Sequence, residues 1–508
     1  MRDMERRNVV EYGLRRWIIV IGVMLAPLME TIDSSIVNGA LPTLQGNLGA
    51  TLDQAAWVVT GYLVANIVVI PLTPWLQTRF GRRQYLTTTI IGFTVASALC
   101  GTAGSIDELI LLRIAQGLFG GGLIATAQAV LRDIFTVEEV ALGQGVFAVI
   151  ILVGPILAPL LGGFIIDAAS WQWIFFINIV PGVVSAWVVG TMLKNPTDPV
   201  ASPVDVTGIA LLAVALGGLQ FMLEEGERRD WFSDAGIVTA AAMALLGTIA
   251  FALWELYGTR HPVVDLRILR FRTVAVGVVI AGGIAATLFG TVLVLPQFTQ
   301  TVLGFTAYDS GLLLLFRALP VMLLAPLVAG FIGAGRLEVR VTIALGFLLN
   351  AIASWWIGSG TTTLSAFGTF LPGLILGGLG TAMLFIPLLI AVQTATPPDE
   401  APKASSFITL AFQLGGSIAS AVLVTMLDRR GDFHLDILSG GITANEPALA
   451  IVRSVTPQQL YGLVVTQAQT NAFADVAYAV AAIATLMIPL VFLLKRVQPS
   501  AAAAVSFE

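Results

Sequence analysis

Long stretches without a single charged side chain dominate the pattern of this chain. The longest lies between Arg340 and Asp399 and covers 58 residues, and the stretches that end before Asp309, Asp167 and Arg79 cover 36, 27 and 25 residues. About 18 apolar residues suffice for a helix to cross the roughly 30 Å hydrocarbon core of a bilayer. Because lipid offers the backbone no hydrogen-bond partners, such segments must be helical. The pattern therefore predicts an all-α membrane protein that crosses the bilayer many times.

Charges and turn-forming residues divide these stretches into fourteen predicted transmembrane helices. Their approximate limits are residues 17–41, 54–76, 85–105, 107–131, 142–166, 171–193, 206–224, 235–257, 273–296, 308–333, 340–358, 365–392, 403–427 and 473–494. An even number of crossings puts both termini on one side. The segment from 429 to 471, between the last two spans, is a long, polar outer loop, and a loop of this length is usually functional or disordered.

The distribution of cations orients this arrangement. Of the 26 Lys and Arg residues, nineteen fall on the side of the termini, five on the other side and two, Arg113 and Arg317, inside predicted helices. Loops rich in Lys and Arg stay in the cytoplasm. We therefore expect the protein to lie in the inner membrane of a bacterium, with both termini in the cytoplasm.

Composition excludes several other classes. Charged residues make up 11% of the chain against about 25% in soluble domains. The one cysteine, Cys100, allows no disulfide within the chain. No glycine-rich loop followed by Lys-Ser/Thr is present, so an ATP-driven pump domain is not expected. We expect no enzyme activity, cofactor, metal site or nucleic-acid partner, and we read the basic N-terminus as leading into a retained first span.

Two carboxylates lie within the first predicted helix. Glu30 and Asp33 are three residues apart and share a helix face. A rise of about 1.5 Å per residue puts Asp33 roughly 24 Å from Trp17, in the outer half of the membrane. Carboxylates there are costly unless they face water or a partner, and two together favour proton uptake. The pair is a candidate for proton coupling; alternatively, Asp33 caps a broken helix or forms a structural ion pair.

The two arginines inside predicted helices raise a related question. Arg113 requires a carboxylate or carbonyl partner at this depth, and Glu30 or Asp33 is the natural candidate. The alternative is that Arg113 snorkels toward the outer surface. Arg317 has no equally clear partner in the sequence.

Small residues mark the fifth predicted helix. Positions 154, 158 and 162 are Gly, Ala and Gly, which form a groove for a neighbouring helix. Pro155 and Pro159 remove backbone donors and bend the helix. Close packing alone explains this pattern, and a bent helix between two halves of a transporter would also seal its cavity.

The loop after the second predicted helix reads Arg79-Phe80-Gly81-Arg82-Arg83. A cationic turn of this kind is typical of cytoplasmic loops in general.

In this order, these segments resemble the major facilitator superfamily, and more closely its 14-helix drug:proton antiporters of the EmrB/QacA type. The string from Asp33 to Pro42 resembles the first-helix signature, Arg113-x-x-Gln-Gly the fourth-helix motif, and Gly154 to Gly163 the antiporter motif of the fifth helix. Further matches lie at residues 54–63, 171–178, 205–208, 262–266 and 413–417.

This sequence also departs from the family pattern. In the loop after the second helix, Thr78 stands in place of an aspartate and Pro74 in place of a glycine. Ala158 replaces a glycine, and Phe412 replaces a frequent arginine. The loss of the aspartate puts in doubt the charge interaction that usually steadies the closed states.

The resemblance implies two six-helix halves, residues 1–195 and 260–508, with a two-helix hairpin, residues 196–259, inserted between them. It also implies that the two halves rock about a central cavity. It implies proton coupling at Asp33, Glu30 and Arg113. Residues expected at the substrate cavity or at gating contacts are Arg317, Gln116, Asn38, Trp57, Gly154, Pro155, Pro159, Gly162 and Gly163. Those of the expected cytoplasmic gating loop are Arg79, Gly81, Arg82 and Arg83.

Our leading hypothesis is a proton-coupled multidrug efflux antiporter that exports hydrophobic small molecules from the bacterial inner membrane. A carboxylate at the position of Glu30 and a long final outer loop resemble features of the inner-membrane pumps of tripartite systems. This resemblance implies a periplasmic adaptor and an outer-membrane channel as partners. One alternative is an exporter of a single siderophore, peptide or metabolite. If that substrate were an anion, a central arginine such as Arg317 would favour its binding. Another is a scaffold or receptor that transports nothing, against which the buried charges argue.

Overall fold

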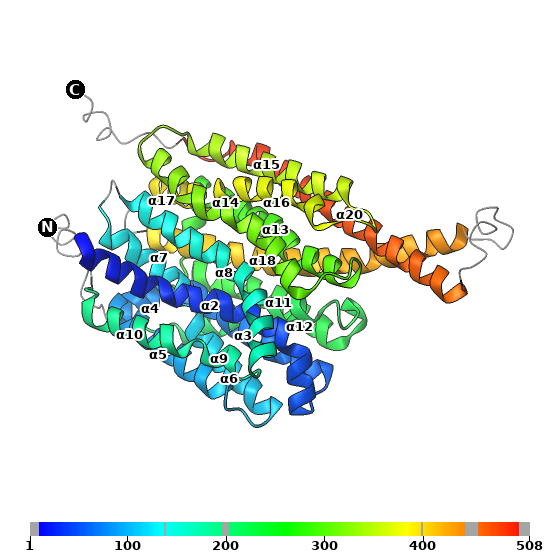
Figure 1. The fold of residues 1–508 in the computed structure, drawn as a ribbon. Coiled ribbons are helices and arrows are strands. Elements are labelled where there is room, and N and C mark those ends of the chain that lie inside the picture. Colours follow the sequence, from blue (N-terminus) through cyan, green and yellow to red (C-terminus); the bar gives the residue numbers. More distant parts are fainter. Residues whose placement is uncertain (1–9, 137–138, 196–202, 398–399, 442–455, 497–508) are drawn as a thin grey trace.

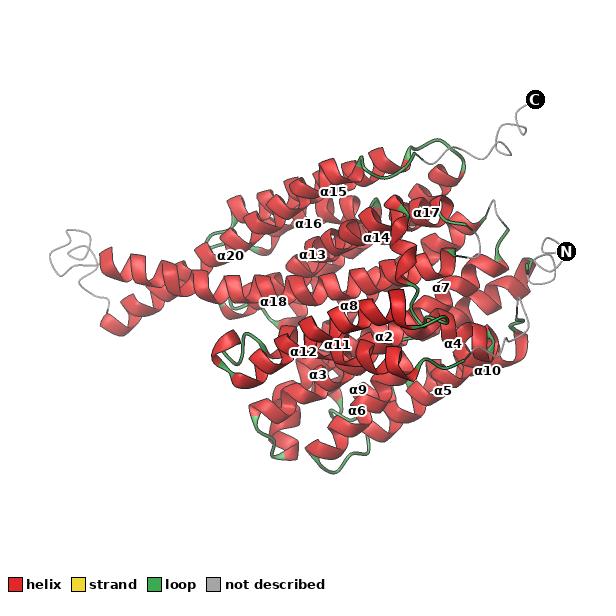
Figure 2. Ribbon diagram, turned by 180° about the vertical axis from the view of Figure 1, so that it is seen from behind, coloured by secondary structure: helices red, strands yellow, loops and turns green. Residues whose placement is uncertain are grey.

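In a computed structural model, residues 10–136, 139–195, 203–397, 400–441 and 456–496 are described, and they form a bundle of helices with no strand among them (Figures 1 and 2). Twelve helical segments of this described part are long and apolar enough to cross a membrane. Two further helices, α5 (Arg82–Cys100) and α8 (Val140–Ala168), pack within the same bundle. The predicted all-α membrane class is confirmed.

The first part of the chain begins with one long helix and continues with several shorter ones. The other elements here are α2 (Gly13–Leu48), α3 (Leu52–Val69), η1 (Ile70–Leu72), α4 (Thr73–Phe80), α6 (Ile106–Gly120), α7 (Leu123–Ile134), α9 (Trp173–Phe176) and α10 (Ile179–Met192). The predicted span 54–76 is divided among α3, η1 and α4, where Pro71 and Pro74 lie in first turns, as proline prefers. The span 107–131 is divided at Gly121 and Gly122.

The glycines near this division allow α6 to approach α3 closely. A Cβ atom on Gly117 would lie 2.3 Å from the carbonyl oxygen of Tyr62, and one on Gly121 would lie 2.3 Å from that of Asn66. Only glycine leaves room for this contact. It brings the polar side chains of the two helices within reach of one another.

The rest of the chain supplies a helix pair and then a second set of long helices. These elements are α11 (Val206–Glu225), η2 (Trp231–Ser233), α12 (Ala235–Leu253), η3 (Trp254–Gly258), η4 (Leu266–Arg270), α13 (Arg272–Thr301), α14 (Ala307–Gly333), α15 (Val339–Gly360), α16 (Phe367–Ala382), α17 (Phe385–Ala395), α18 (Ala401–Gly441) and α20 (Pro457–Val491). Helix α11 packs against α12, against α3 and against α18.

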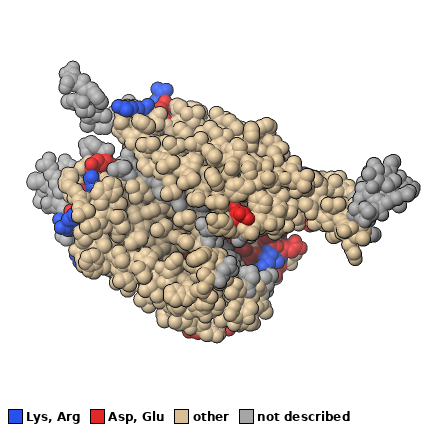
Figure 3. Space-filling model, in the orientation of Figure 1, with Lys and Arg blue, Asp and Glu red and all other residues tan. Residues whose placement is uncertain are grey.

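The beginning of α2 and the end of α20 lie at one end of the bundle, which we call the terminal end (Figure 1). At the opposite, distal end, α18 and α20 project beyond the other helices. On the face drawn in Figure 3, charged residues gather toward these two ends, and an uncharged belt lies between them (Figure 3). This distribution matches a slab of lipid around the middle of the bundle.

The described parts of the predicted loop 429–471 are helical, apart from the residue before Pro457. Helix α18 continues to Gly441 and α20 begins at Pro457, while residues 442–455 lie outside the described part. The predicted helix ends at 427 and 473 were wrong because charges end an apolar run without ending a helix. Arg430 donates to Asp475 at 2.6 Å and His434 lies 2.8 Å from the same carboxylate, so the two helices hold each other.

Helix α8 packs against α2 and against α14. A Cβ atom on Gly154 would lie 2.1 Å from Thr31 Oγ1, and one on Gly162 would lie 2.9 Å from the Ile36 side chain. The predicted groove of small residues therefore receives α2. A Cβ atom on Gly163 would meet no described atom within 4 Å, so this glycine makes no such close contact.

Candidate functional site

Helix α2 runs without a break through the residues that carry the two predicted carboxylates. Asp33 is fully buried and Glu30 is 3% exposed. The hydroxyl of Thr31, between them, donates to the carbonyl oxygen of Pro27 at 2.9 Å within the same helix. The hydrogen bonds to the two carboxylates therefore come from other parts of the chain. Asp33 therefore does not cap a broken helix.

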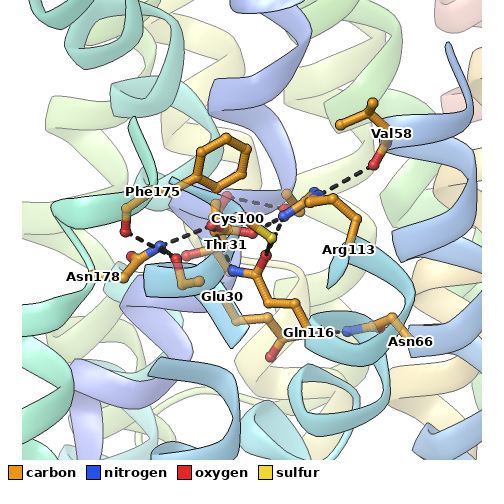
Figure 4. A network of polar contacts seen from close by, with 12 residues as sticks. Glu30, Thr31, Val58, Asn66, Cys100, Arg113, Gln116, Phe175 and Asn178 are labelled. Carbon is orange, nitrogen blue, oxygen red and sulfur yellow. Dashed lines mark hydrogen bonds and ion pairs between the residues drawn. The ribbon is translucent and has the colours of Figure 1, made fainter. Parts of the chain in front are cut away.

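Asp33 receives hydrogen bonds from three side chains. Arg113 of α6 donates through a guanidinium nitrogen at 2.5 Å, and the amide of Gln116, one turn later, donates at 2.9 Å. The amide of Asn178, between α9 and α10, donates at 2.8 Å. Figure 4 shows Arg113 and Gln116, both from α6, and Asn178 within one network of polar contacts (Figure 4). One guanidinium and two amide groups therefore donate to the Asp33 carboxylate.

Arg113 is fully buried, so the alternative that it snorkels to the surface was wrong. Besides Asp33, it donates to the carbonyl oxygen of Val58 at 3.1 Å and to Gln116 Oε1 at 2.8 Å. Its guanidinium carbon lies 4.1 Å from the centre of the Tyr62 ring. Helices α2, α3 and α6 thus share one charge pair, and the predicted partnership of Arg113 with a first-helix carboxylate is confirmed.

A second layer of polar contacts fixes these partners. Asn178 also donates to Ser97 of α5 at 3.0 Å, and Ser97 donates to the carbonyl oxygen of Phe175 at 2.9 Å. The thiol of Cys100 lies 3.7 Å from Gln116 Oε1. The network therefore extends from the charge pair into α5 and the segment before α10 (Figure 4).

Glu30 has a different environment from Asp33. The amide of Asn66 on α3 donates to Glu30 Oε1 at 2.9 Å, and Glu30 Oε2 is buried with no hydrogen-bond partner among the described residues. Asn66 in turn accepts a hydrogen bond from Gln413 of α18 at 3.0 Å. The cluster thus contains two carboxylates and one arginine. Two consecutive hydrogen bonds, through Asn66, connect Glu30 to Gln413 of α18.

Arg317 is buried in the other half, on α14. Its guanidinium donates to Thr291 Oγ1 at 3.1 Å, to Asn350 Oδ1 at 3.1 Å and to Thr381 Oγ1 at 3.2 Å. It also reaches the carbonyl oxygen of Thr287 at 3.3 Å. These four acceptors come from α13, α15 and α16, and all are neutral. The part of the chain that the structure describes gives Arg317 no carboxylate partner, so its charge stays uncompensated there.

The arginines of the predicted gating loop tie the terminal end of the first half together. Arg82 pairs with Asp133 of α7, and Arg83 donates to the carbonyl oxygen of Gly190 on α10. Arg79 lies over the ring of Trp75, 5.6 Å from its centre. Gly81 links α4 to α5 with a φ of 81°, a conformation that favours glycine. These contacts bind helices of one half.

A cavity of about 270 Å³ opens beside this loop, between the two halves. Its walls include Pro74, Trp75, Arg82, Asp265, Lys403 and Phe407. Lys403 donates to Asp265 at 3.2 Å on one wall. The cavity lies at the terminal end, away from the Asp33 cluster.

Of the remaining predicted residues, Trp57 lies against Phe221 of α11, with ring centres 5.2 Å apart. The side chains of Asn38, Pro155 and Pro159 lie outside the described part of the structure. Gln116 belongs to the Asp33 cluster. Sequence reasoning did not assign Asn66, Asn178 or Gln413, although each is a large amide inside an apolar run, which was the available signal.

A bundle that crosses a membrane many times and buries a charge pair between its helices has the architecture of a transporter. The sequence profile of the Major Facilitator Superfamily matches residues 23–420, and the chain belongs to this family. It is therefore a membrane transporter and not an enzyme.

Its relatives include bacterial proteins of multidrug export and of resistance. The chain is 32% identical to the multidrug export protein EmrB of Escherichia coli K12, over 92% of this chain and 90% of that protein. It is 34% identical to the fatty acid resistance protein FarB of Neisseria gonorrhoeae, over 82% of each. Among solved structures, a double-tryptophan mutant of XylE shares the fold, with a TM-score of 0.62 at 14% identity, over 96% of this chain and 98% of that one.

Proposed function

We propose that this protein is a proton-coupled multidrug efflux antiporter. Multidrug export by the relatives supports the substrate class. The observation that carries proton coupling is the fully buried Asp33–Arg113 pair with Glu30 beside it. One arginine neutralises one carboxylate, so an ionised Glu30 would leave a net negative charge in a buried site, and a bound proton would remove it.

Glu30 also offers a route from proton binding to movement. Its contact with Asn66 continues to Gln413 on α18, so one chain of amides joins the first half to the second. A charged Glu30 accepts from Asn66 more strongly than a neutral one does. Loss of the proton would therefore tighten this contact, and uptake of a proton would loosen it.

The proposed topology has fourteen membrane helices. We place α5 and α8 in the membrane with the twelve segments that qualify by composition. The halves are 1–195 and 260–508 with the pair 196–259 between them. The excess of cations near the terminal end supports a cytoplasmic location for both termini, in the inner membrane of a bacterium.

A narrower, anionic substrate is a second candidate, because Arg317 is buried without a carboxylate partner among the described residues. Burying an unpaired charge is costly, and an acidic substrate would compensate it during transport. A relative that confers fatty acid resistance supports this reading. Such a substrate would combine an apolar body with a carboxylate.

The projecting helices are the proposed docking surface for a periplasmic adaptor, which would connect to an outer-membrane channel. Beyond the membrane, α18 exposes Phe433 and Ile437, which are 47% and 56% exposed, and α20 exposes Tyr461 and Leu463, which are 61% and 60% exposed. Apolar side chains exposed on a rigid helix pair favour a helical partner.

Transport by purified protein in liposomes tests the central proposal. An imposed pH gradient should drive uptake of dyes and antiseptics. Asp33→Asn should abolish this uptake while the protein stays folded, since the amide keeps the shape of the side chain but removes its negative charge. Full gradient-driven transport by Asp33→Asn would exclude a role of Asp33 in proton coupling. Transport by the wild type that ignores the pH gradient would exclude proton coupling altogether.

A further inference from the structure

We propose that α11 is the distal gate of the transporter: it moves with the first half, and its contact with α18 breaks when the distal end opens. The proposal rests on the proposed transport function. It assigns a role to the polar residues of α11, none of which belongs to the Asp33 cluster.

The two halves meet directly only along part of their length at this interface. Ser406 of α18 donates to the carbonyl oxygen of Ile70 at 3.0 Å, and Gln413 donates to Asn66 at 3.0 Å. The Ser406 contact lies nearer the terminal end, where α18 begins, and the Gln413 contact lies seven residues further along α18, where Asn66 also contacts Glu30. Nearer the distal end, the contacts that the structure describes run through α11.

On the side of the first half, α11 makes both a polar and an apolar contact. Thr60 of α3 donates to Glu225 Oε1 at 2.8 Å, while the other oxygen of Glu225 accepts from Arg228 and Arg229. Ile67 of α3 and Leu216 of α11 lie in one buried apolar cluster. Helix α3 therefore shares with α11 both a buried core and a carboxylate whose two oxygens are occupied.

On the side of the second half, the contact is weaker. Gln220 donates to Ser417 of α18 at 2.9 Å, and its own carbonyl oxygen is buried without a partner in the described structure. Trp231, in η2 after the end of α11, donates to Thr425 of α18 at 3.0 Å, and the Thr425 hydroxyl donates to the Glu227 carboxylate. Even with these contacts, α11 packs less extensively against α18 than against α3. The apolar residues of α18 near this cluster are only partly buried. Because a buried contact with an unsatisfied acceptor is easily given up, this side should separate first.

The distal opening that alternating access requires must part α3 from α18. Since α11 fills the space between them, it must separate from one or the other. The shared core and the paired carboxylate keep it on α3. The Gln220–Ser417 and Trp231–Thr425 contacts then form and break in each cycle.

Two cysteine pairs test which contact breaks. Both variants keep Cys100, which is fully buried. One variant carries Val64→Cys and Gly217→Cys, because a Cβ at Gly217 lies 3.6 Å from the Val64 side chain. The other carries Gln220→Cys and Ser417→Cys. Each pair is joined by a short disulfide-forming cross-linker that a reductant cleaves, and dye transport in liposomes is measured before and after cleavage.

We expect the cross-link between α3 and α11 to leave at least half of the transport rate. The cross-link between α11 and α18 should reduce the rate at least tenfold, and the reductant should restore it. Normal transport with α11 linked to α18, or a block that appears with α11 linked to α3, would overturn the proposal. A Trp231→Cys, Thr425→Cys pair replaces the second pair if reduction does not restore its activity, with the same expected block.

The wild-type protein distinguishes failure of the proposed gate from failure of the proposed function. If it shows no gradient-driven transport, the proposed function fails, and the gate fails with it. If it transports and the two cross-links behave alike, only the gate is refuted.

Discussion

Replacing Arg113 with methionine should destabilise the protein in a way that depends on pH. Methionine keeps most of the length of the side chain and removes the charge, which leaves Asp33 buried with only its two amide donors. Removing one partner of a buried ion pair typically costs about 3–5 kcal/mol. The loss has an upper limit, because Asp33 can take up a proton and become neutral.

That limit follows from the ordinary behaviour of aspartate. A carboxyl that ionises near pH 3.9 in the unfolded chain costs about 4 kcal/mol to protonate at pH 7, and about 1.5 kcal/mol at pH 5. The free energy of unfolding of Arg113→Met should therefore fall below that of the wild type by about 3–4 kcal/mol at pH 7 and by about 1.5 kcal/mol at pH 5. The sign is fixed, since a buried, unpaired carboxyl is less unfavourable where protons are abundant.

Unfolding in mixed detergent micelles at the two pH values measures these differences. The matched control is the double variant Asp33→Asn/Arg113→Met, which removes both charges and should recover most of the lost stability while remaining inactive in transport. An equal loss at both pH values would refute the reasoning. So would a double variant that is no more stable than Arg113→Met alone, because the cost would then come from packing and not from charge.

Three further outcomes can be measured. Glu30→Gln should keep substrate binding but abolish the proton release that substrate causes in unbuffered detergent solution. Asn66→Leu should reduce this proton release without abolishing it. Unchanged proton release in Glu30→Gln would exclude Glu30 as the exchanging group. Arg317→Gln should reduce transport of long-chain carboxylates at least tenfold and leave cationic dyes within about twofold, and equal losses for both would assign Arg317 a structural role. Deleting residues 437–469 should leave transport in liposomes intact and abolish drug resistance in cells with two membranes, and full resistance in such cells would exclude these helices as the adaptor site.

Hydropathy alone was sufficient for the helical class and for most of the membrane segments, because the cost of an unpaired backbone in lipid leaves no other structure. It was not sufficient for the helix ends. Charges at residues 428–432 end an apolar run, but α18 continues past them to Gly441, because water tolerates a polar helix as well as a loop. Hydropathy reports where lipid ends, and here the helix and the lipid end at different residues.

The charged members of the site could be predicted and the amides could not. Glu30, Asp33 and Arg113 stand out because each is expensive in a membrane. Asn66, Asn178 and Gln413 cost less, so many positions of this kind serve only packing. Their importance depends on which helices adjoin, and Gln413 is 347 residues away from its partner Asn66. Such long-range pairing cannot be read from a single sequence.

The same pairing explains how two carboxylates three residues apart can have different roles. Asp33 binds donors that all belong to the first half, so a rocking motion of the halves leaves its surroundings unchanged. Glu30 is bound by Asn66, whose own partner Gln413 belongs to the second half, so the same motion alters the donor that Glu30 receives. A group can couple protons to movement only if the movement changes its affinity for a proton. By this criterion we propose that Glu30 exchanges the proton and that the Asp33–Arg113 pair keeps its charges during the cycle.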